Sequence, residues 1–228
     1  MVISLFLVFL FPLAVYLLVL AAINRREKPL LVSGICDALG LTFALAGVYL
    51  WIGPAILGTL YERGLLPGAD GESNRRFIEI WTYYPYVWAA YYLLVIVGQT
   101  SMVLSRSNKT SIYNVDAVGL ERLLADCFRR RGYEVSEAGG TLLIRSGEST
   151  GAVEIDRFLA LRHVTLQWFL SDAELRGRIE ADLENRLDEA STPDNPIASW
   201  LMGVSGTLFG LVIVGGFFSV LLMRFSIR

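Results

Sequence analysis

The amino-acid sequence predicts an all-α membrane protein, with four transmembrane helices and a small α+β extramembrane domain inserted before the last of them. Two observations favour this class. The 228 residues have only 18% charged side chains, whereas soluble domains carry about 25%, and the mean hydropathy is +0.50. The charges are also unevenly spread, because long apolar runs alternate with one polar block over about 107–195. Such unevenness is typical of membrane proteins.

Four apolar runs match the length of about 20 residues that a helix needs to cross hydrocarbon. We expect three spans at about 2–23, 30–61 and 80–104 in a membrane region 1–105, and a fourth span with a short tail in 197–228. The second run is longer than one crossing needs, so we expect it to tilt or to break near Gly53 and Pro54.

The flanks of the first run set the expected orientation. No basic residue precedes it, and Arg25, Arg26 and Lys28 follow it. Because basic flanks stay in the cytoplasm, this indicates an uncleaved anchor in a bacterial inner membrane with a cytoplasmic soluble domain. Counted over all the flanks, these three included, basic residues are balanced between the two sides, so the assignment rests on the first run alone.

The polar block, 106–196, predicts a helix, a four-stranded antiparallel sheet and a second helix. Asp116 is the expected cap of the first helix and Gly132 its end. Strands are expected at 133–136, 141–145, 153–156 and 163–169, with Gly139-Gly140 as a turn. A capping box over 171–174 opens the second helix, whose apolar stripe is Leu175, Ile179, Leu183 and Leu187.

Asp37 is the candidate polar contact inside the membrane. An ionisable side chain within a span is costly and is a functional hypothesis by default. It could serve as a proton-relay carboxylate or pair with a cation on another subunit. The alternative is a local role, since Asp37 lies near the helix end and close in sequence to Arg25, Arg26 and Lys28.

Small residues and aromatic rings give two further candidate sites. Gly203, Gly206 and Gly210 share one face of the last span and include a GxxxG match. This pattern allows close packing of helices, either within the chain or against another subunit. Rings gather at the start of the third span, and we expect Trp81, Tyr84, Trp88 and Tyr92 either to contact a lipid, quinone, pigment or partner, or to form an interfacial belt with internal packing.

Catalytic motifs are missing. The one histidine, His163, is expected at the surface of a strand, and no P-loop, GxSxG or CxxC pattern occurs. Residues 120–135 resemble the opening helix and strand of restriction-endonuclease-like domains, but the catalytic acid and acid-x-Lys triplet of that family are missing. We therefore expect no enzyme activity, no cofactor and no metal site. The net charge of −2 argues against nucleic acid as a partner.

These observations favour a non-catalytic accessory or scaffolding subunit of a larger membrane complex, for which an energy-transducing complex, photosynthetic or respiratory, is a guess. The expected partners are the lipid bilayer and other membrane subunits. Two alternatives stay open at this point: a small transporter or ion-conducting component that uses Asp37, and a membrane-tethered regulatory or sensory domain.

Overall fold

The computed structural model describes residues 10–62, 85–146, 149–158, 162–192 and 195–226. Their contacts divide the chain into two compact units. One unit draws its described residues from within Met1–Tyr16, Leu41–Met102 and Val204–Arg228, and the other comprises Leu17–Gly40 and Val103–Gly203. We call them the helical unit and the sheet unit.

Four apolar helices each contribute residues to both units. They are α2 (Phe11–Asn24), α3 (Gly34–Glu62), α5 (Pro85–Ser105) and α8 (Pro196–Ser226). Within the described ranges, two helical stretches are long and apolar enough to cross a membrane, α5 and the Pro196–Phe218 part of α8. The apolar helices Phe11–Asn24 and Gly34–Leu50 are shorter than this. The prediction of four transmembrane helices is therefore wrong for the residues described, because spanning takes about 20 residues.

The prediction of a four-stranded sheet is also wrong. The sheet has six antiparallel strands in the order β1-β2-β6-β5-β4-β3. The bounds are β1 Leu30–Ser33, β2 Lys109–Tyr113, β3 Glu134–Ala138, β4 Thr141–Ser146, β5 Ser149–Phe158 and β6 His163–Phe169. The four predicted strands correspond to β3 to β6. The two missed strands are β1, which opens an apolar run assigned to one helix, and β2, which follows α5 after three residues.

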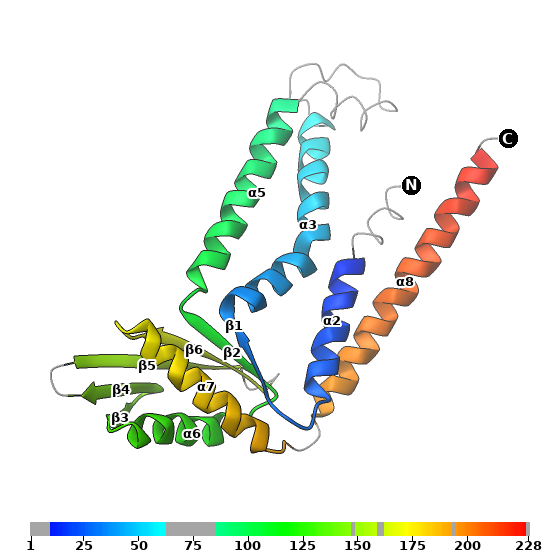
Figure 1. The fold of residues 1–228 in the computed structure, drawn as a ribbon. Coiled ribbons are helices and arrows are strands. Elements are labelled where there is room, and N and C mark those ends of the chain that lie inside the picture. The colour runs from blue at the N-terminus through cyan, green and yellow to red at the C-terminus, as the bar shows by residue number, and fades with distance from the viewer. Residues whose placement is uncertain (1–9, 63–84, 147–148, 159–161, 193–194, 227–228) are drawn as a thin grey trace. The chain divides into compact units, whose positions relative to one another are not determined.

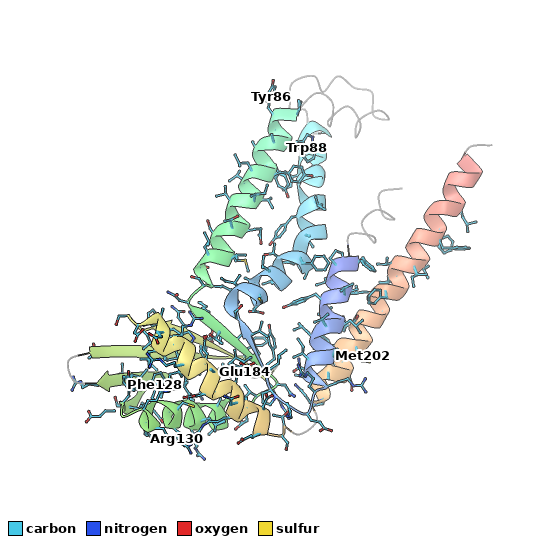
Figure 2. All side chains as sticks on the ribbon, viewed as in Figure 1. Tyr86, Trp88, Phe128, Arg130, Glu184 and Met202 are labelled. Carbon is cyan, nitrogen blue, oxygen red and sulfur yellow. The ribbon has the colours of Figure 1, made fainter. Side chains whose placement is uncertain are left out.

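Two helices cover one face of this sheet, α6 (Ala117–Arg130) and α7 (Ala173–Glu189), as Figure 1 shows. The caps keep the predicted helices in place, because the Asp116 carboxylate accepts from Gly119 N–H and the Asp172 carboxylate accepts from Glu174 and Leu175 N–H. The stripe predicted for α7 is buried, together with Leu120, Leu124 and Phe128 of α6 and with Val153, Val164, Leu166 and Trp168 of the sheet. Figure 2 labels Phe128, which is buried in this core.

Turn chemistry joins β3 to β4 as the sequence predicts. Gly139 and Gly140 have φ of 58° and 86°, and a two-residue hairpin with both central residues at positive φ suits glycine best. The hairpin pairs Ala138 with Thr141.

Strand β2 is fixed from both faces. On the helix-covered face, Thr110 Oγ1 accepts a hydrogen bond from Trp168 Nε1 at 2.8 Å and donates to Glu180 of α7. Arg176 of α7 holds Glu180 at 2.9 Å and donates to the Ser107 carbonyl, also at 2.9 Å. Because successive side chains of a strand point to opposite faces, Ser111 and Tyr113 lie on the other face.

The helical unit contains two described helix pairs. Thr42 of α3 donates to Gln99 Oε1 of α5 at 2.9 Å, and Trp88, which is 4% exposed, lies on the side of α5 that faces α3 (Figure 2). Ser205 of α8 donates to the Ala14 carbonyl of α2 at 2.8 Å, and the Phe11 and Phe209 rings meet edge to face at 5.6 Å.

Candidate functional site

Asp37, in the first turn of α3, lies at the centre of a polar cluster in the sheet unit. Its carboxylate accepts hydrogen bonds from Ser111 Oγ at 2.9 Å, from Arg106 Nη1 at 3.0 Å and from the Tyr113 hydroxyl. The Asp37 side chain is 7% exposed and that of Arg106 is 30% exposed. The carboxylate is thus nearly buried, with an ionic partner and two hydroxyl donors, an arrangement that offsets the cost of removing a charge from water.

The backbone brings these residues together from distant parts of the sequence. Strand β1 runs directly into α3, and β2 begins shortly after α5 ends. Antiparallel pairing of Val32 with Ser111 and of Leu30 with Tyr113 places the base of α3 beside the free face of β2. Gly34 permits the close approach, because a Cβ at this position would lie 2.4 Å from the Arg106 carbonyl oxygen.

His163 extends the cluster along the sheet. Its imidazole stacks on the Tyr113 ring with centroids 4.5 Å apart and an angle of 13° between the planes. The Nε2 atom is buried and has no hydrogen-bond partner among the described residues. Burial lowers the pKa of His163 from its usual value, Arg106 lowers it further, and Asp37 and Asp156 oppose the shift. The ring lies on the sheet face opposite the core, as the sequence predicts, and Tyr113 covers part of it, so that His163 is half-buried.

We call the contacts of Asp37 with Arg106, Ser111 and Tyr113 the clamp, because they hold one carboxylate by an ion pair and two hydroxyl hydrogen bonds. Its carboxylate is held by Arg106, Ser111 and Tyr113, so three elements (α3, the segment after α5, and β2) converge on one charge. In the described part of the chain, no group of three or more His, Cys, Asp or Glu side chains gathers in a way that could hold a metal ion. The sequence suggested Arg25, Arg26 or Lys28 as local partners of Asp37. The structure pairs Asp37 with Arg106 instead.

Comparisons with known proteins do not identify a family for this chain. No protein-family model, curated protein or solved structure matches this chain.

The glycine face of α8 is open in the structure. A Cβ built on Gly203, Gly206 or Gly210 would meet no described heavy atom within 4 Å. In the helical unit, α8 contacts α2 through Ser205 and Phe209 instead. The two packing roles that the sequence suggests for these glycines, within the chain or against another subunit, stay predictions.

The predicted aromatic site is only partly described. Trp81 and Tyr84 lie outside the described residues. Trp88 stacks on Tyr92 with centroids 6.0 Å apart, and Tyr91 packs edge to face on both rings. In contrast, Tyr86 is 87% exposed and points away from α5 (Figure 2). Trp88 and Tyr92 thus take part in packing within the chain, and no ligand contact is assigned to them.

Sequence reasoning selected Asp37 but missed Arg106, Ser111 and Tyr113. The available signal was the segment 109–113, in which the β-branched residues Thr110 and Ile112 alternate with polar Lys109 and Ser111 and are followed by Tyr113. This pattern favours a strand, and a strand at that position would have placed Ser111 and Tyr113 on one face.

Proposed function

We propose that this chain is a non-catalytic, membrane-anchored accessory subunit that packs through α8 against another membrane protein. The observation that carries the proposal is the open glycine face of α8, centred on Gly206 and Gly210. Small residues let helix backbones approach closely in lipid, where van der Waals contact drives association. Ser205 and Phe209, which contact α2, lie about 100° around the helix from Gly206 and Gly210, and this leaves the face of Gly206 and Gly210 for a second helix.

The exposed apolar surface of the chain supports the same proposal. Only 6% of the candidate span in α5 is buried, and large side chains of α8 such as Trp200, Ile213 and Phe217 are more than 60% exposed. Apolar surface of this extent requires lipid or protein cover. Both kinds of cover fit a membrane subunit, and the glycines favour protein at one face of α8.

A transport role for Asp37 fits the arrangement less well. A relay carboxylate must exchange protons or ions, whereas the oxygens of Asp37 accept from Arg106, Ser111 and Tyr113. We therefore propose a structural role for Asp37, as the contact that holds the base of α3 to β2.

The experiment is paired substitution in α8, followed by extraction in a mild detergent and native electrophoresis. Gly206→Ile together with Gly210→Ile adds bulk to the open face, and we expect loss of the companion subunits that migrate with the unaltered chain. Leu211→Phe is the control, because Leu211 is exposed on the same helix and lies about 100° around it from Gly210. Companions that persist in the double variant would contradict the proposal.

A further inference from the structure

A pocket of about 260 Å³ lies in the sheet unit, where the end of α2 meets the start of α8. Its volume is below the about 300 Å³ at which pockets for drug-sized ligands begin, so it suits a small chemical group. No acidic residue is among the described residues of its wall, which are Asn24, Arg25, Asn195, Pro196, Ala198 and Ser199.

Two buried asparagines join the two sides of this pocket. Asn195 Nδ2 donates to Asn24 Oδ1 at 2.8 Å, Asn24 Nδ2 donates to the Leu20 carbonyl at 2.9 Å, and Asn195 Oδ1 accepts from Ile197 N–H at 3.2 Å. Asn24 is 1% exposed and Asn195 is 6% exposed. Because each side-chain nitrogen and oxygen of the pair has a partner, the asparagines fix the two helix ends and leave ligand binding to other wall residues.

Arg25 brings a positive charge to the wall. Its Nη1 donates to Sδ of Met202, which Figure 2 labels, at 3.5 Å, and none of the ion pairs among the described residues includes Arg25. A guanidinium has five N–H donors, and a thioether sulfur is a weak acceptor. Met202 follows Ala198 and Ser199 by about one turn, so it lies on the same side of α8 as these wall residues. The exposed Arg25 is therefore held next to the pocket with donors available to an anion.

The pocket lies at one end of a candidate membrane span. The part of α8 that is long and apolar enough to cross a membrane begins at Pro196, one of the wall residues, and has 23 residues. At about 1.5 Å per residue such a helix is about 35 Å long, slightly more than the hydrocarbon core of about 30 Å. Trp200 is 67% exposed in the first turns, and tryptophan is enriched where headgroups meet hydrocarbon. The wall residues of α8 therefore fall at the level of the lipid phosphates.

We propose that this pocket binds a phosphate group, supplied by a phospholipid headgroup, with Arg25 and the Ser199 hydroxyl as its donors. Arginine pairs with phosphate through parallel N–H donors, and this contact gives the guanidinium an acceptor much stronger than the sulfur of Met202. The inference rests on membrane anchoring through α8, which is part of the proposed function, but it does not need a companion subunit.

Native mass spectrometry of the full chain in a neutral detergent tests the proposal, because it counts the lipid molecules that stay bound. The probe is dioctanoylphosphatidylglycerol. Its counterpart is dioctanoylglycerol, which has the same acyl chains without the phosphate. We expect one molecule of the phospholipid to be retained in a saturable way and the counterpart to bind much more weakly. Sodium phosphate distinguishes a free phosphate from a headgroup, and we expect that an equal concentration of it does not displace the phospholipid.

A matched pair of variants isolates the charge of Arg25. Arg25→Gln should weaken retention of the phospholipid about tenfold or more, which corresponds to about 1.4 kcal/mol or more. Arg26→Gln removes the same charge at the next residue, which is exposed and is not among the described wall residues, and it should retain the phospholipid like the unaltered chain. Arg25→Lys keeps the charge but loses the planar pair of donors, so it should fall between. Circular dichroism verifies that each variant is folded.

Three outcomes would overturn the phosphate site. They are equal retention of the phospholipid by folded Arg25→Gln and Arg26→Gln, binding of dioctanoylglycerol as tight as that of the phospholipid, and displacement of the phospholipid by an equal concentration of sodium phosphate. None of them bears on companion subunits, which the glycine variants of α8 test separately. The phosphate site and the accessory role can therefore fail independently of each other.

Discussion

At the residue scale, Asp37 shows how a charge can be kept at the end of an apolar helix. Three donors from the segment 106–113 surround one carboxylate, and the side chain is 7% exposed. Breaking a buried ion pair on one side leaves the remaining charge poorly compensated. We therefore propose that Asp37 stabilises the fold and takes no part in chemistry.

The substitution Asp37→Asn tests this assignment. It keeps the shape of the side chain but removes the charge that Arg106 pairs with, so we expect a loss of about 2 kcal/mol in the free energy of unfolding. Asp126→Asn is the matched control, because the Asp126–Arg129 pair is 53% and 54% exposed, and exposed pairs contribute less than about 1 kcal/mol. Urea unfolding of the full chain in detergent, followed by tryptophan fluorescence, measures both. Equal stability of the two variants would contradict the clamp.

His163 predicts a dependence of stability on pH. Because burial lowers its pKa in the folded chain, the unfolded chain, with a histidine pKa near about 6.5, binds the proton first. The stability that neutral His163 contributes to the folded chain is therefore present above about pH 6.5, and it is lost as the pH falls toward the folded pKa. His163→Phe keeps a ring against Tyr113, and the free energy of unfolding of this variant should depend less on pH.

The comparison between His163→Phe and the unaltered chain isolates the imidazole. Asp37, Asp156 and Arg106, which act on His163, are present in both proteins. Unfolding free energies measured between pH 7.5 and 5.5 should converge or cross for the two proteins as the pH falls. Parallel curves would show that His163 does not titrate in this range.

At the element scale, the predictions that succeeded rest on local signals. Asp116 caps α6, α7 begins at the predicted box with Asp172 rather than Ser171 as its cap, and two glycines form the turn after β3. Strand β2 was missed although its short alternating pattern is visible in the sequence. Strand β1 was missed because its neighbours in sequence are apolar, and only its pairing with β2, between residues about 80 apart, reveals it. Long-range pairing of this kind leaves little mark on a single short segment.

Gly34→Ala tests the contact between α3 and β2. The added methyl group would lie 2.4 Å and 2.7 Å from the backbone oxygens of Arg106 and Lys109, so backbone must move, at a cost of about 1–3 kcal/mol. Gly177→Ala in α7 is the control. Nothing described lies within 4 Å of a Cβ built at Gly177. Replacing an exposed helix glycine by alanine stabilises the fold by about 0.5–1 kcal/mol. The two variants should therefore shift the unfolding free energy in opposite directions.

At the scale of the whole molecule, composition alone indicated apolar helices joined to a folded polar block. The number of spans was overestimated, because an apolar run was equated with one crossing although Leu30–Ser33 forms a strand. The glycine stripe and Asp37 were selected from the sequence, but what they contact could not be read from spacing. The predicted division at residues 105 and 196 stays a prediction.

Membrane anchoring through α5 and α8 predicts that the chain resists extraction at high pH. After an alkaline carbonate wash the chain should stay in the membrane pellet and leave it only with detergent. A peripheral protein held by surface charge would be released by the wash, and recovery in the supernatant would contradict anchoring by these helices.

The proposal that this chain is a subunit of a larger membrane assembly can be tested by native mass spectrometry after gentle detergent extraction. We expect a complex in which the 25.3 kDa chain occurs with different membrane proteins in a fixed ratio. A species of 25.3 kDa alone, or one made only of copies of this chain, would contradict it.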